Sequence, residues 1–504
     1  MRQEVGDPRA PSASDAGRVL VAQSYFLAFD PKLQEAGQPV PPLGALIFAA
    51  LLRERGFEVR IFDAMLAASE EECGEAMDRF APDTLVIFED NFNYLSKMSL
   101  ERMRRAAARM IDLARERGIE VAVSGSDASE DTLFYLRAGA TVVAKGEGDL
   151  SIAEWLRAPS RGLARIPGIV SLDTLGGGDA GAPREAMTDL DALPAPAWDL
   201  IDLDAYRRIW MTRHGSFSLP LATSRGCPFH CNWCAKPIWG RRYHAVSPAR
   251  AAVEFETLER LGASHVNVLD DIFGLKPGWL SAFADELAAR GTRLPFKCLS
   301  RADLLDEVAV QALRRAGCSM VWIGAESGAQ KVLDLMEKGT TVAEIRAAAL
   351  RLRAAGIKVG FFLQFGYPGE TPDDIEATLA LVEEVLPDDI GVSVSYPLPG
   401  TPFHARVEHE LGRATRWQDS NDLAMLFRGL HGTTYYRRLH SYTHARFRLA
   451  RALRGSDRAL SRRLLRVLRY GLARGVMAVA LALAARERPR MTLPPPAPSG
   501  AASS

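Results

Sequence analysis

Two series of strand-like segments that alternate with helical segments constrain the fold of this chain most strongly. The first series occupies residues 18–157 and the second occupies residues 214–411. Such alternation produces parallel sheets, because each helix returns the chain to the edge where the next strand begins. The pattern therefore predicts an α/β protein with two separate sheets, and a chain of 504 residues is long enough to bury both.

The first series predicts a doubly wound, Rossmann-like domain. Its strand-like segments are short and apolar, and the segment 100–118 between two of them has the periodicity of a long amphipathic helix. Doubly wound sheets bind ligands at the carboxyl ends of their strands. The residues expected at those ends are Ser24, Glu89, Asp90, Ser124, Gly125, Ser126, Gly146, Glu147 and Gly148.

The second series predicts a partial (β/α)6 barrel of the TIM type, in which the chemistry takes place at the carboxyl ends of the strands. Six strand-like segments carry this prediction, and helical segments that often end in glycine separate them. The strands are expected at residues 221–225, 265–271, 295–300, 319–327, 358–366 and 390–397.

The remaining segments are distinguished by composition. Residues 1–17 and 491–504 are polar or rich in Pro, Ala and Ser, which predicts disorder. Residues 158–213 contain Gly-rich and Pro-rich stretches and are interpreted as a linker. Residues 412–490 lose the strand pattern and are predicted to form a helical, Arg-rich C-terminal domain.

Three of the six cysteines, Cys227, Cys231 and Cys234, lie within eight residues and follow the first barrel strand. Three thiolates with this CxxxCxxC spacing can converge on one metal centre. A structural zinc site usually has four ligands, and His230, which could supply the fourth, is adjacent to Cys231. A [4Fe–4S] cluster held by three cysteines leaves one iron open for chemistry.

Sparse cysteine favours a reducing, cytoplasmic location over a disulfide framework.

The CxxxCxxC motif after the first strand of a partial barrel resembles the signature of the radical S-adenosylmethionine (SAM) superfamily. The resemblance implies that Cys227, Cys231 and Cys234 ligate a [4Fe–4S] cluster, with Phe229 and Trp233 packed around it. It also implies that the open iron binds the amino and carboxylate groups of SAM. Reduction by an electron donor such as flavodoxin or ferredoxin would then cleave SAM to a 5′-deoxyadenosyl radical.

The residues after the later barrel strands extend the resemblance. The stretches LDDIFG, SRADLL, IGAESG and FGYPGET resemble those of a subgroup that joins this barrel to a cobalamin-binding domain. By position, the resemblance implies SAM contacts for Asp271, Arg301, Glu326, Ser327 and Gly369. The alternative for each residue is a structural role, such as capping a helix. No residue is assigned as catalytic.

Residues 41–64, 142–156 and 191–201 resemble stretches of cobalamin-binding domains fused to radical enzymes. The resemblance implies that Ser124, Gly125, Ser126, Gly146, Glu147 and Gly148 bind cobalamin, although a plain tight turn would equally explain residues 124–126. Many such domains coordinate cobalt through a histidine in a DxHxxG motif, whereas the first histidine here is His214. We therefore expect that no histidine of this domain coordinates the lower face of the cobalt. The alternative is a degenerate domain that binds no cobalamin.

The resemblance covers roughly residues 18–410 and implies an enzyme that uses the radical, with cobalamin, on an unactivated carbon of a small molecule such as a lipid or a tetrapyrrole. Methyl transfer is the favoured outcome. The alternative is cyclase-like or rearrangement chemistry, as in the anaerobic magnesium-protoporphyrin ester cyclases of the same subgroup. The alternative from another class is a cobalamin-binding sensor or scaffold with an inactive barrel.

Positive charge is concentrated near the C-terminus. Residues 431–490 carry fifteen Arg, no Lys, one Asp and one Glu, a net charge of +13 in a chain whose overall charge is zero. Residues 462–488 can form a mainly apolar helix that would lie on an anionic membrane surface; the alternative is a helix packed on the barrel with solvated arginines. The apolar run 475–485 has only eleven residues, which predicts that it does not span a bilayer. No nucleic-acid-binding module is recognisable, so no nucleic-acid partner is expected.

Overall fold

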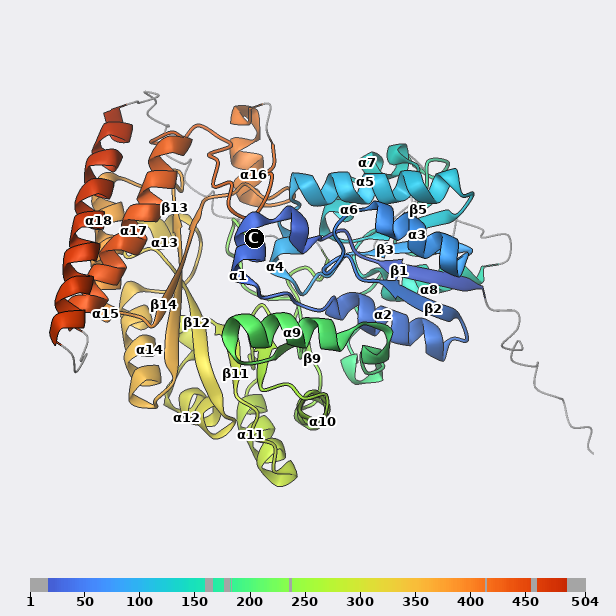
Figure 1. Cartoon of the computed structure of the whole chain (residues 1–504), viewed down its shortest axis with the longest axis horizontal. Coiled ribbons are helices and arrows are strands. Elements are labelled where there is room, and N and C mark those ends of the chain that lie inside the picture. Colours follow the sequence, from blue (N-terminus) through green and yellow to red (C-terminus); the bar gives the residue numbers. More distant parts are fainter. Residues whose placement is uncertain are drawn as a thin grey trace, which may run out of the picture. The chain divides into compact units, whose positions relative to one another are not determined.

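The computed structural model describes residues 17–158, 166–175, 182, 184–234, 238–412, 415–454 and 460–486. The disorder predicted for residues 1–17 and 491–504 therefore concerns segments outside the described residues, apart from Gly17. Internal contacts divide the chain into two compact units (Figure 1). The first consists mainly of residues 1–222, and the second consists mainly of residues 223–504.

The first unit contains a six-stranded sheet with the order β2-β1-β3-β4-β5-β6. The first five strands pair in parallel, which confirms the predicted doubly wound arrangement, and β6 is antiparallel to β5. The strand order reverses direction between β1 and β3, and in open α/β sheets such a switch point is where ligands bind. The strands are β1 (Arg18–Ala22), β2 (Glu58–Phe62), β3 (Thr84–Phe88), β4 (Glu120–Ser124), β5 (Val142–Ala144) and β6 (Ile169–Val170).

Helices cover both faces of this sheet. Successive side chains of a strand point to opposite faces, and on this sheet the side chains on each face are apolar. Leu85 and Ile87 of β3 belong to one core, whereas Val86 belongs to the core on the opposite face. The helices of this unit are α1 (Pro31–Ala36), α2 (Leu43–Glu54), α3 (Glu71–Phe80), α4 (Tyr94–Lys97), α5 (Glu101–Glu116), α6 (Ser126–Glu130), α7 (Thr132–Ala138), α8 (Gly148–Arg157) and α9 (Leu203–His214).

A second six-stranded sheet has the order β14-β13-β12-β11-β10-β7, and the strands from β10 to β14 pair in parallel. The predicted first strand, 221–225, is divided into β7 and a separate strand β8 (Ser224–Arg225). A further short strand is β9 (His244–Ala245). The sheet strands are β7 (Ser218–Leu221), β10 (His265–Val268), β11 (Phe296–Ser300), β12 (Cys318–Glu326), β13 (Lys358–Phe365) and β14 (Asp389–Val394).

Helices of the same unit cover one face of the second sheet, which gives the half-barrel predicted from the sequence (Figure 1). Val321 and Ile323 of β12 are fully buried, whereas Trp322 between them projects to the opposite, open face. The helices are α10 (Pro248–Arg260), α11 (Trp279–Arg290), α12 (Glu307–Arg315), α13 (Gln330–Leu335), α14 (Val342–Ala354), α15 (Pro372–Val385) and α16 (Pro402–Val407).

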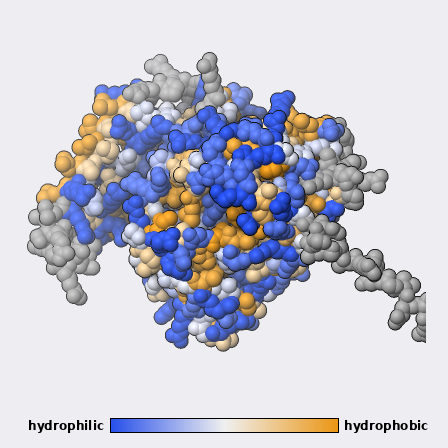
Figure 2. All heavy atoms as spheres, turned by 45° about the vertical axis from the view of Figure 1, so that its right-hand side comes forward, coloured by the Kyte–Doolittle hydropathy of each residue, from blue (hydrophilic) through white to orange (hydrophobic). Residues whose placement is uncertain are grey.

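Two long helices, α17 (Thr433–Arg454) and α18 (Leu460–Arg486), form the predicted helical C-terminal region and lie side by side. Arg446 of α17 forms paired hydrogen bonds of 2.7–2.8 Å with both Glu376 and Glu383 of α15 and so fastens α17 to the half-barrel. Hydrophobic side chains gather at the left margin of the view in Figure 2, the side on which Figure 1 places α18.

One segment of α18, Arg466–Arg486, is long and apolar enough to cross a membrane by length and composition. The prediction that no segment spans a bilayer rests on the uninterrupted apolar run of eleven residues, whereas the helix that contains this run is longer and includes Arg469 and Arg474. Length alone therefore does not decide how this helix is used.

Candidate active site

The loop that carries the three cysteines begins at an anchor on Asp270, at the end of β10. The Asp270 carboxylate accepts hydrogen bonds from the backbone N–H groups of Thr223 and Ser224, at 2.6 and 3.2 Å, and from both hydroxyls, at 2.5 and 2.7 Å. Burial raises the pKa of Asp270 to about 6, and these four bonds act in the opposite direction. They separate β7 from β8 and fix the start of the loop three residues before Cys227.

Asn232 anchors the middle of the same loop and is fully buried. Its side-chain Nδ2 donates to the carbonyl oxygen of Leu335 at 2.9 Å and to Glu337 Oε1 at 3.1 Å, while its Oδ1 accepts from the Tyr367 hydroxyl at 2.6 Å. Its backbone N–H donates to the carbonyl oxygen of Met336 at 3.1 Å. The residue between Cys231 and Trp233 is therefore held by the segment after β12 and by the turn after β13.

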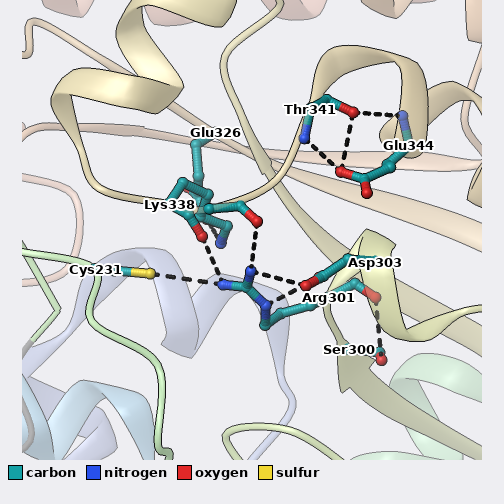
Figure 3. Close-up of polar contacts among 9 residues, drawn as sticks. Cys231, Ser300, Arg301, Asp303, Glu326, Lys338, Thr341 and Glu344 are labelled. Carbon is teal, nitrogen blue, oxygen red and sulfur yellow. Dashed lines mark hydrogen bonds and ion pairs between the residues drawn. The ribbon is translucent and has the colours of Figure 1, made fainter.

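Arg301, directly after β11, lies beside the second cysteine (Figure 3). Its Nη1 is 3.8 Å from Cys231 Sγ, and its guanidinium carbon is 3.7 Å from the centre of the Phe229 ring. The other donors bind both carboxylate oxygens of Asp303 at 3.0 Å and the carbonyl oxygens of Lys338 and Gly339 at 2.8 and 3.2 Å. All five N–H groups of Arg301 thus have a protein acceptor, and its predicted direct contact with SAM stays a prediction.

A buried ion pair completes this corner of the site. Lys338 Nζ donates to Glu326 Oε1 at 2.9 Å, and both side chains are less than a tenth exposed (Figure 3). Burial lowers the pKa of Lys338, but the charges of Glu326 and Cys231 outweigh it and leave the pKa raised. Glu326 has a φ of 59°, a left-handed conformation that is costly for a non-glycine residue and that is often found at functional sites.

The three cysteines form no disulfide with one another or with another described residue; Cys227 is buried, and Cys231 and Cys234 are partly buried. Among the residues that the structure describes, no three His, Cys, Asp or Glu side chains converge closely enough to hold a single metal ion. A [4Fe–4S] cluster makes a different demand, since each thiolate binds its own iron. His230, considered above as a fourth ligand, accepts a hydrogen bond at Nδ1 from Arg241 at 2.8 Å.

The other residues predicted to contact SAM have different environments. Ser327 is fully buried; its hydroxyl is 3.0 Å from Thr378 Oγ1 and accepts from the Ala329 N–H at 3.1 Å, so it fixes the turn after β12 onto α15. Gly369 adopts a φ of 91° in the turn after β13. Asp271 is exposed in the loop after β10, beside the buried anchor Asp270.

Glu370 closes the turn that contains Gly369. Its Oε2 accepts from the Gly366 N–H at 2.6 Å, while its buried Oε1 has no partner among the described residues. Burial raises the pKa of Glu370 to about 8, so this carboxyl is mainly protonated at neutral pH. It lies at the carboxyl end of the half-barrel, after β13.

The open face of the half-barrel carries a flat aromatic surface. The rings of Trp322 and Phe362 are stacked with centroids 4.6 Å apart and an interplanar angle of 23°. Glycines beneath them make the arrangement possible, because a Cβ at Gly360 would lie 2.4 Å from the Trp322 ring and one at Gly391 would lie 2.9 Å from the Phe362 ring. Phe362 remains 39% exposed, which leaves apolar surface for a ligand.

The first unit has its own candidate site, where β1, β3 and β4 end side by side. Three buried polar side chains there have atoms without partners among the described residues, namely both polar atoms of Gln23, Oε2 of Glu89 and Oγ of Ser124. The other oxygen of Glu89 accepts from the Ser24 N–H at 3.1 Å, and burial raises the pKa of Glu89 to about 7. Unpaired buried polar atoms are costly, so their concentration at a switch point favours a polar ligand.

The remaining positions predicted for cobalamin surround this edge. A Cβ at Gly125 would lie 2.6 Å from Glu89 Cβ, and one at Gly148 would lie 2.2 Å from Ser124 Oγ, so both glycines permit close packing. Ser126 Oγ is 3.2 Å from Asn91 Oδ1. The other two positions are engaged locally: Gly146 N–H donates to Ser129 Oγ at 3.1 Å, and Glu147 Oε2 accepts from Met187 N–H at 2.9 Å.

His214, the first histidine of the chain, ends α9 in the first unit. Its Nε2 lies 3.0 and 3.1 Å from the carbonyl oxygens of Ala36 and Gly37. Because a carbonyl oxygen only accepts hydrogen bonds, Nε2 carries the proton, and the lone pair of a neutral ring lies on Nδ1.

The residues that hold the cysteine loop and the ion pair were not assigned as site residues from the sequence, and they include Asn232, Lys338 and Asp270. Asn232 could have been found, since it lies inside the CxxxCxxC motif. Lys338 could not, because its contact with Glu326 depends on how the chain folds back after α13.

The fold and the cysteine loop together define a class of radical enzyme built on a parallel half-barrel. Residues 221–382 match the radical SAM superfamily, so this part of the chain is a radical SAM domain, which indicates an enzyme. A [4Fe–4S] cluster and SAM are the cofactors of that family, and Cys227, Cys231 and Cys234 are the residues that fit the cluster.

Relatives resemble the chain beyond the barrel. An uncharacterised methyltransferase of Pyrococcus horikoshii is 26% identical over 373 residues, which cover 72% of this chain and 78% of that protein. The hopanoid C-3 methylase of Methylococcus capsulatus is 24% identical over 71% of this chain and 67% of its own. The anaerobic magnesium-protoporphyrin IX monomethyl ester cyclase of Cereibacter sphaeroides is 26% identical, over 54% of this chain and 45% of that protein.

Solved structures agree on the fold. The radical SAM methyltransferase TsrM of Kitasatospora setae, solved with cobalamin and a [4Fe–4S] cluster bound, has a TM-score of 0.65 at 20% identity and covers 78% of both chains. The cobalamin-dependent radical SAM enzyme OxsB, solved with aqua-cobalamin and SAM, has a TM-score of 0.70 at 16% identity over 93% of this chain and 72% of that one.

Proposed function

We propose that this enzyme uses SAM and cobalamin to transfer a methyl group to an unactivated carbon of a small, largely apolar molecule. The observation that carries the proposal is the cysteine loop, which Asp270, Asn232 and Arg301 hold at the carboxyl end of the half-barrel. When bound and reduced, the cluster supplies the electron that cleaves SAM. The protein contributes placement, charge and exclusion of water.

Charge around Cys231 supports this function. Arg301 and Lys338 are two buried cations, and Arg301 directly contacts the thiol. Positive charge beside a thiolate stabilises it and also favours the carboxylate of a bound amino acid. Because all five donors of Arg301 are used, Lys338 and Glu326 are the better candidates for direct contact with the SAM methionyl group.

Cobalamin is proposed for the first unit. Support comes from the switch point between β1 and β3, from the unpartnered polar atoms of Gln23, Glu89 and Ser124, and from the cobalamin present in the solved structures that share this fold. These side chains and the edge formed by residues 124–126 and 146–148 would hold it. No histidine of the segment 18–157 is proposed as a cobalt ligand, since that segment contains none.

A flat, apolar substrate is proposed for the half-barrel. The stacked Trp322 and Phe362 rings offer a planar surface on its open face. Two of the relatives are named for polycyclic compounds, a hopanoid and a magnesium-protoporphyrin ester, which are a lipid and a tetrapyrrole. A low-potential electron donor such as flavodoxin or ferredoxin would complete the system.

Cyclase-like chemistry without methyl transfer is the second candidate, favoured by the similarity to the magnesium-protoporphyrin ester cyclase. A single anaerobic assay separates the candidates. The full chain is reconstituted with iron and sulfide and given SAM and a reductant, with or without cobalamin, beside a Cys231→Ala control. Methyl transfer predicts 5′-deoxyadenosine together with S-adenosylhomocysteine that appears only when cobalamin is present.

The other outcomes of this assay decide against the proposal. 5′-Deoxyadenosine without S-adenosylhomocysteine, from protein that has bound cobalamin, would favour the cyclase-like alternative. If neither product forms with a full complement of iron, the enzyme assignment fails and a cobalamin-binding sensor or scaffold becomes the better explanation.

A further inference from the structure

The outer face of α18 carries an exposed stripe of aliphatic side chains. Leu468, Leu472, Val476, Val479 and Leu483 are each more than half exposed, and Leu472 reaches 73%. Their spacing of three and four residues places them within an arc of about 80° on a helix with 3.6 residues per turn. They therefore form one continuous apolar strip along the helix, which we call the α18 stripe.

The opposite side of α18 is occupied by the protein. The helix lies along α17, and the charge of Arg474 helps to lower the pKa of Glu383 on α15. Ala484 is buried. Only the stripe side is thus free to bind a partner, and a helix fixed lengthwise in this way is not arranged to cross a bilayer.

The charge of the helix selects the partner. Residues 460–486 contain six Arg and no acidic residue. Arg469 is exposed and lies next to the stripe on the helix surface, and Arg486 continues the line of the stripe at its C-terminal end. A second copy of the chain would bring the same positive charge to the contact, whereas an anionic lipid surface attracts the arginine side chains.

We propose that the α18 stripe docks the enzyme on the surface of an anionic membrane, with the aliphatic side chains inserted among the lipids and the flanking arginines at the headgroups. Such binding is peripheral, because α18 lies lengthwise along α17 and is not free to cross the bilayer. This inference concerns binding alone and does not rest on the proposed reaction.

Vesicle co-sedimentation of the full chain tests the proposal. The probes are vesicles of phosphatidylcholine and vesicles of an equal mixture of phosphatidylcholine and phosphatidylglycerol. We expect binding to the mixed vesicles, weaker binding at high salt, and little binding to phosphatidylcholine alone. The variant Leu468→Ser/Leu472→Ser/Val479→Ser changes only exposed side chains and should reduce the partition coefficient at least about tenfold.

The matched control is Val308→Ser/Leu350→Ser, which removes aliphatic side chains that are 70% and 58% exposed on α12 and α14. It should bind as the unmodified protein does. Failure of the unmodified protein to bind anionic vesicles, or equal binding by the stripe variant, would overturn the proposal. So would a stripe that mediates self-association in sedimentation velocity without vesicle binding, or membrane binding that resists extraction with carbonate, which indicates a spanning helix.

Discussion

Arg301 directs one N–H of its guanidinium group at the sulfur of Cys231, 3.8 Å away, while Asp303 and two backbone carbonyls hold the other four N–H groups. A cation fixed in this way cannot rotate away when the thiol becomes a thiolate. The contact joins the end of β11 to the cysteine loop, and therefore links the fold of the half-barrel to the chemistry of the site.

Arg301→Met should destabilise the protein by about 1–3 kcal/mol, because the buried carbonyl oxygen of Lys338 loses its donor. It should also shift the midpoint potential of the reconstituted cluster to more negative values, since positive charge beside the thiolate favours the reduced state. Redox titration followed by electron paramagnetic resonance measures this shift. The matched exposed variant Arg346→Met, which breaks the ion pair with Glu384, should leave the potential unchanged.

Gln23→Leu tests the cobalamin site. The buried side-chain amide of Gln23 has no partner among the described residues, so its replacement by an apolar group of similar size should leave the cofactor-free protein equally stable or more stable. Cobalamin binding, measured by equilibrium dialysis with hydroxocobalamin, should weaken at least about tenfold, the equivalent of one lost buried hydrogen bond. The exposed control Gln34→Leu should bind normally. Unchanged binding by Gln23→Leu would remove this residue from the site.

Glu370 should make stability depend on pH. Its folded pKa of about 8 lies above the ordinary value of 4.5, so the folded state holds a proton that the unfolded state has lost between these values. Stability contributed by Glu370 is therefore present below pH 4.5 and is lost as the pH rises towards 8. Glu370→Gln should melt at a higher temperature than the unmodified protein at pH 8.5, with a smaller difference at pH 5.5. A difference in melting temperature that is the same at both pH values would contradict this. The control is Glu259→Gln, which changes an exposed carboxyl and should show no such pH dependence.

Gly360→Ala should disturb the aromatic surface. The added methyl group would lie 2.4 Å from the Trp322 ring, so the ring must move away from Phe362 at a cost of about 1–3 kcal/mol. Thermal melting and near-UV circular dichroism should both change. Gly412→Ala, where a Cβ meets nothing within 4 Å, is the control and should alter neither. A normal near-UV spectrum for Gly360→Ala would show that the stack tolerates the methyl group.

Local sequence signals predicted most of the fold because they arise within single elements. Strand periodicity and glycine at helix ends placed the two parallel sheets, and the cysteine spacing placed the loop. The division of the first barrel strand was not predictable, since it depends on Asp270, which lies 47 residues beyond Thr223. The antiparallel pairing of β6 with β5, inside the segment interpreted as a linker, was not evident from the sequence.

The supports of the candidate site are long-range contacts, which local patterns do not encode. Asn232 reaches Glu337 across 105 residues, and Arg301 reaches Cys231 across 70. The identity of Arg301 was predicted from its place after a strand, whereas its five acceptors became visible only in the folded chain. The exposure of the α18 stripe likewise depends on which side of that helix packs on α17.

Measurement of 5′-deoxyadenosine from the anaerobically reconstituted full chain tests the central claim most directly. The account predicts that the product forms with SAM and a low-potential reductant, that Cys231→Ala abolishes it, and that Arg301→Lys retains part of it. Equal amounts of 5′-deoxyadenosine from the unmodified protein and from Cys231→Ala, or none from protein with a full complement of iron, would contradict the claim that this loop is the radical-generating site.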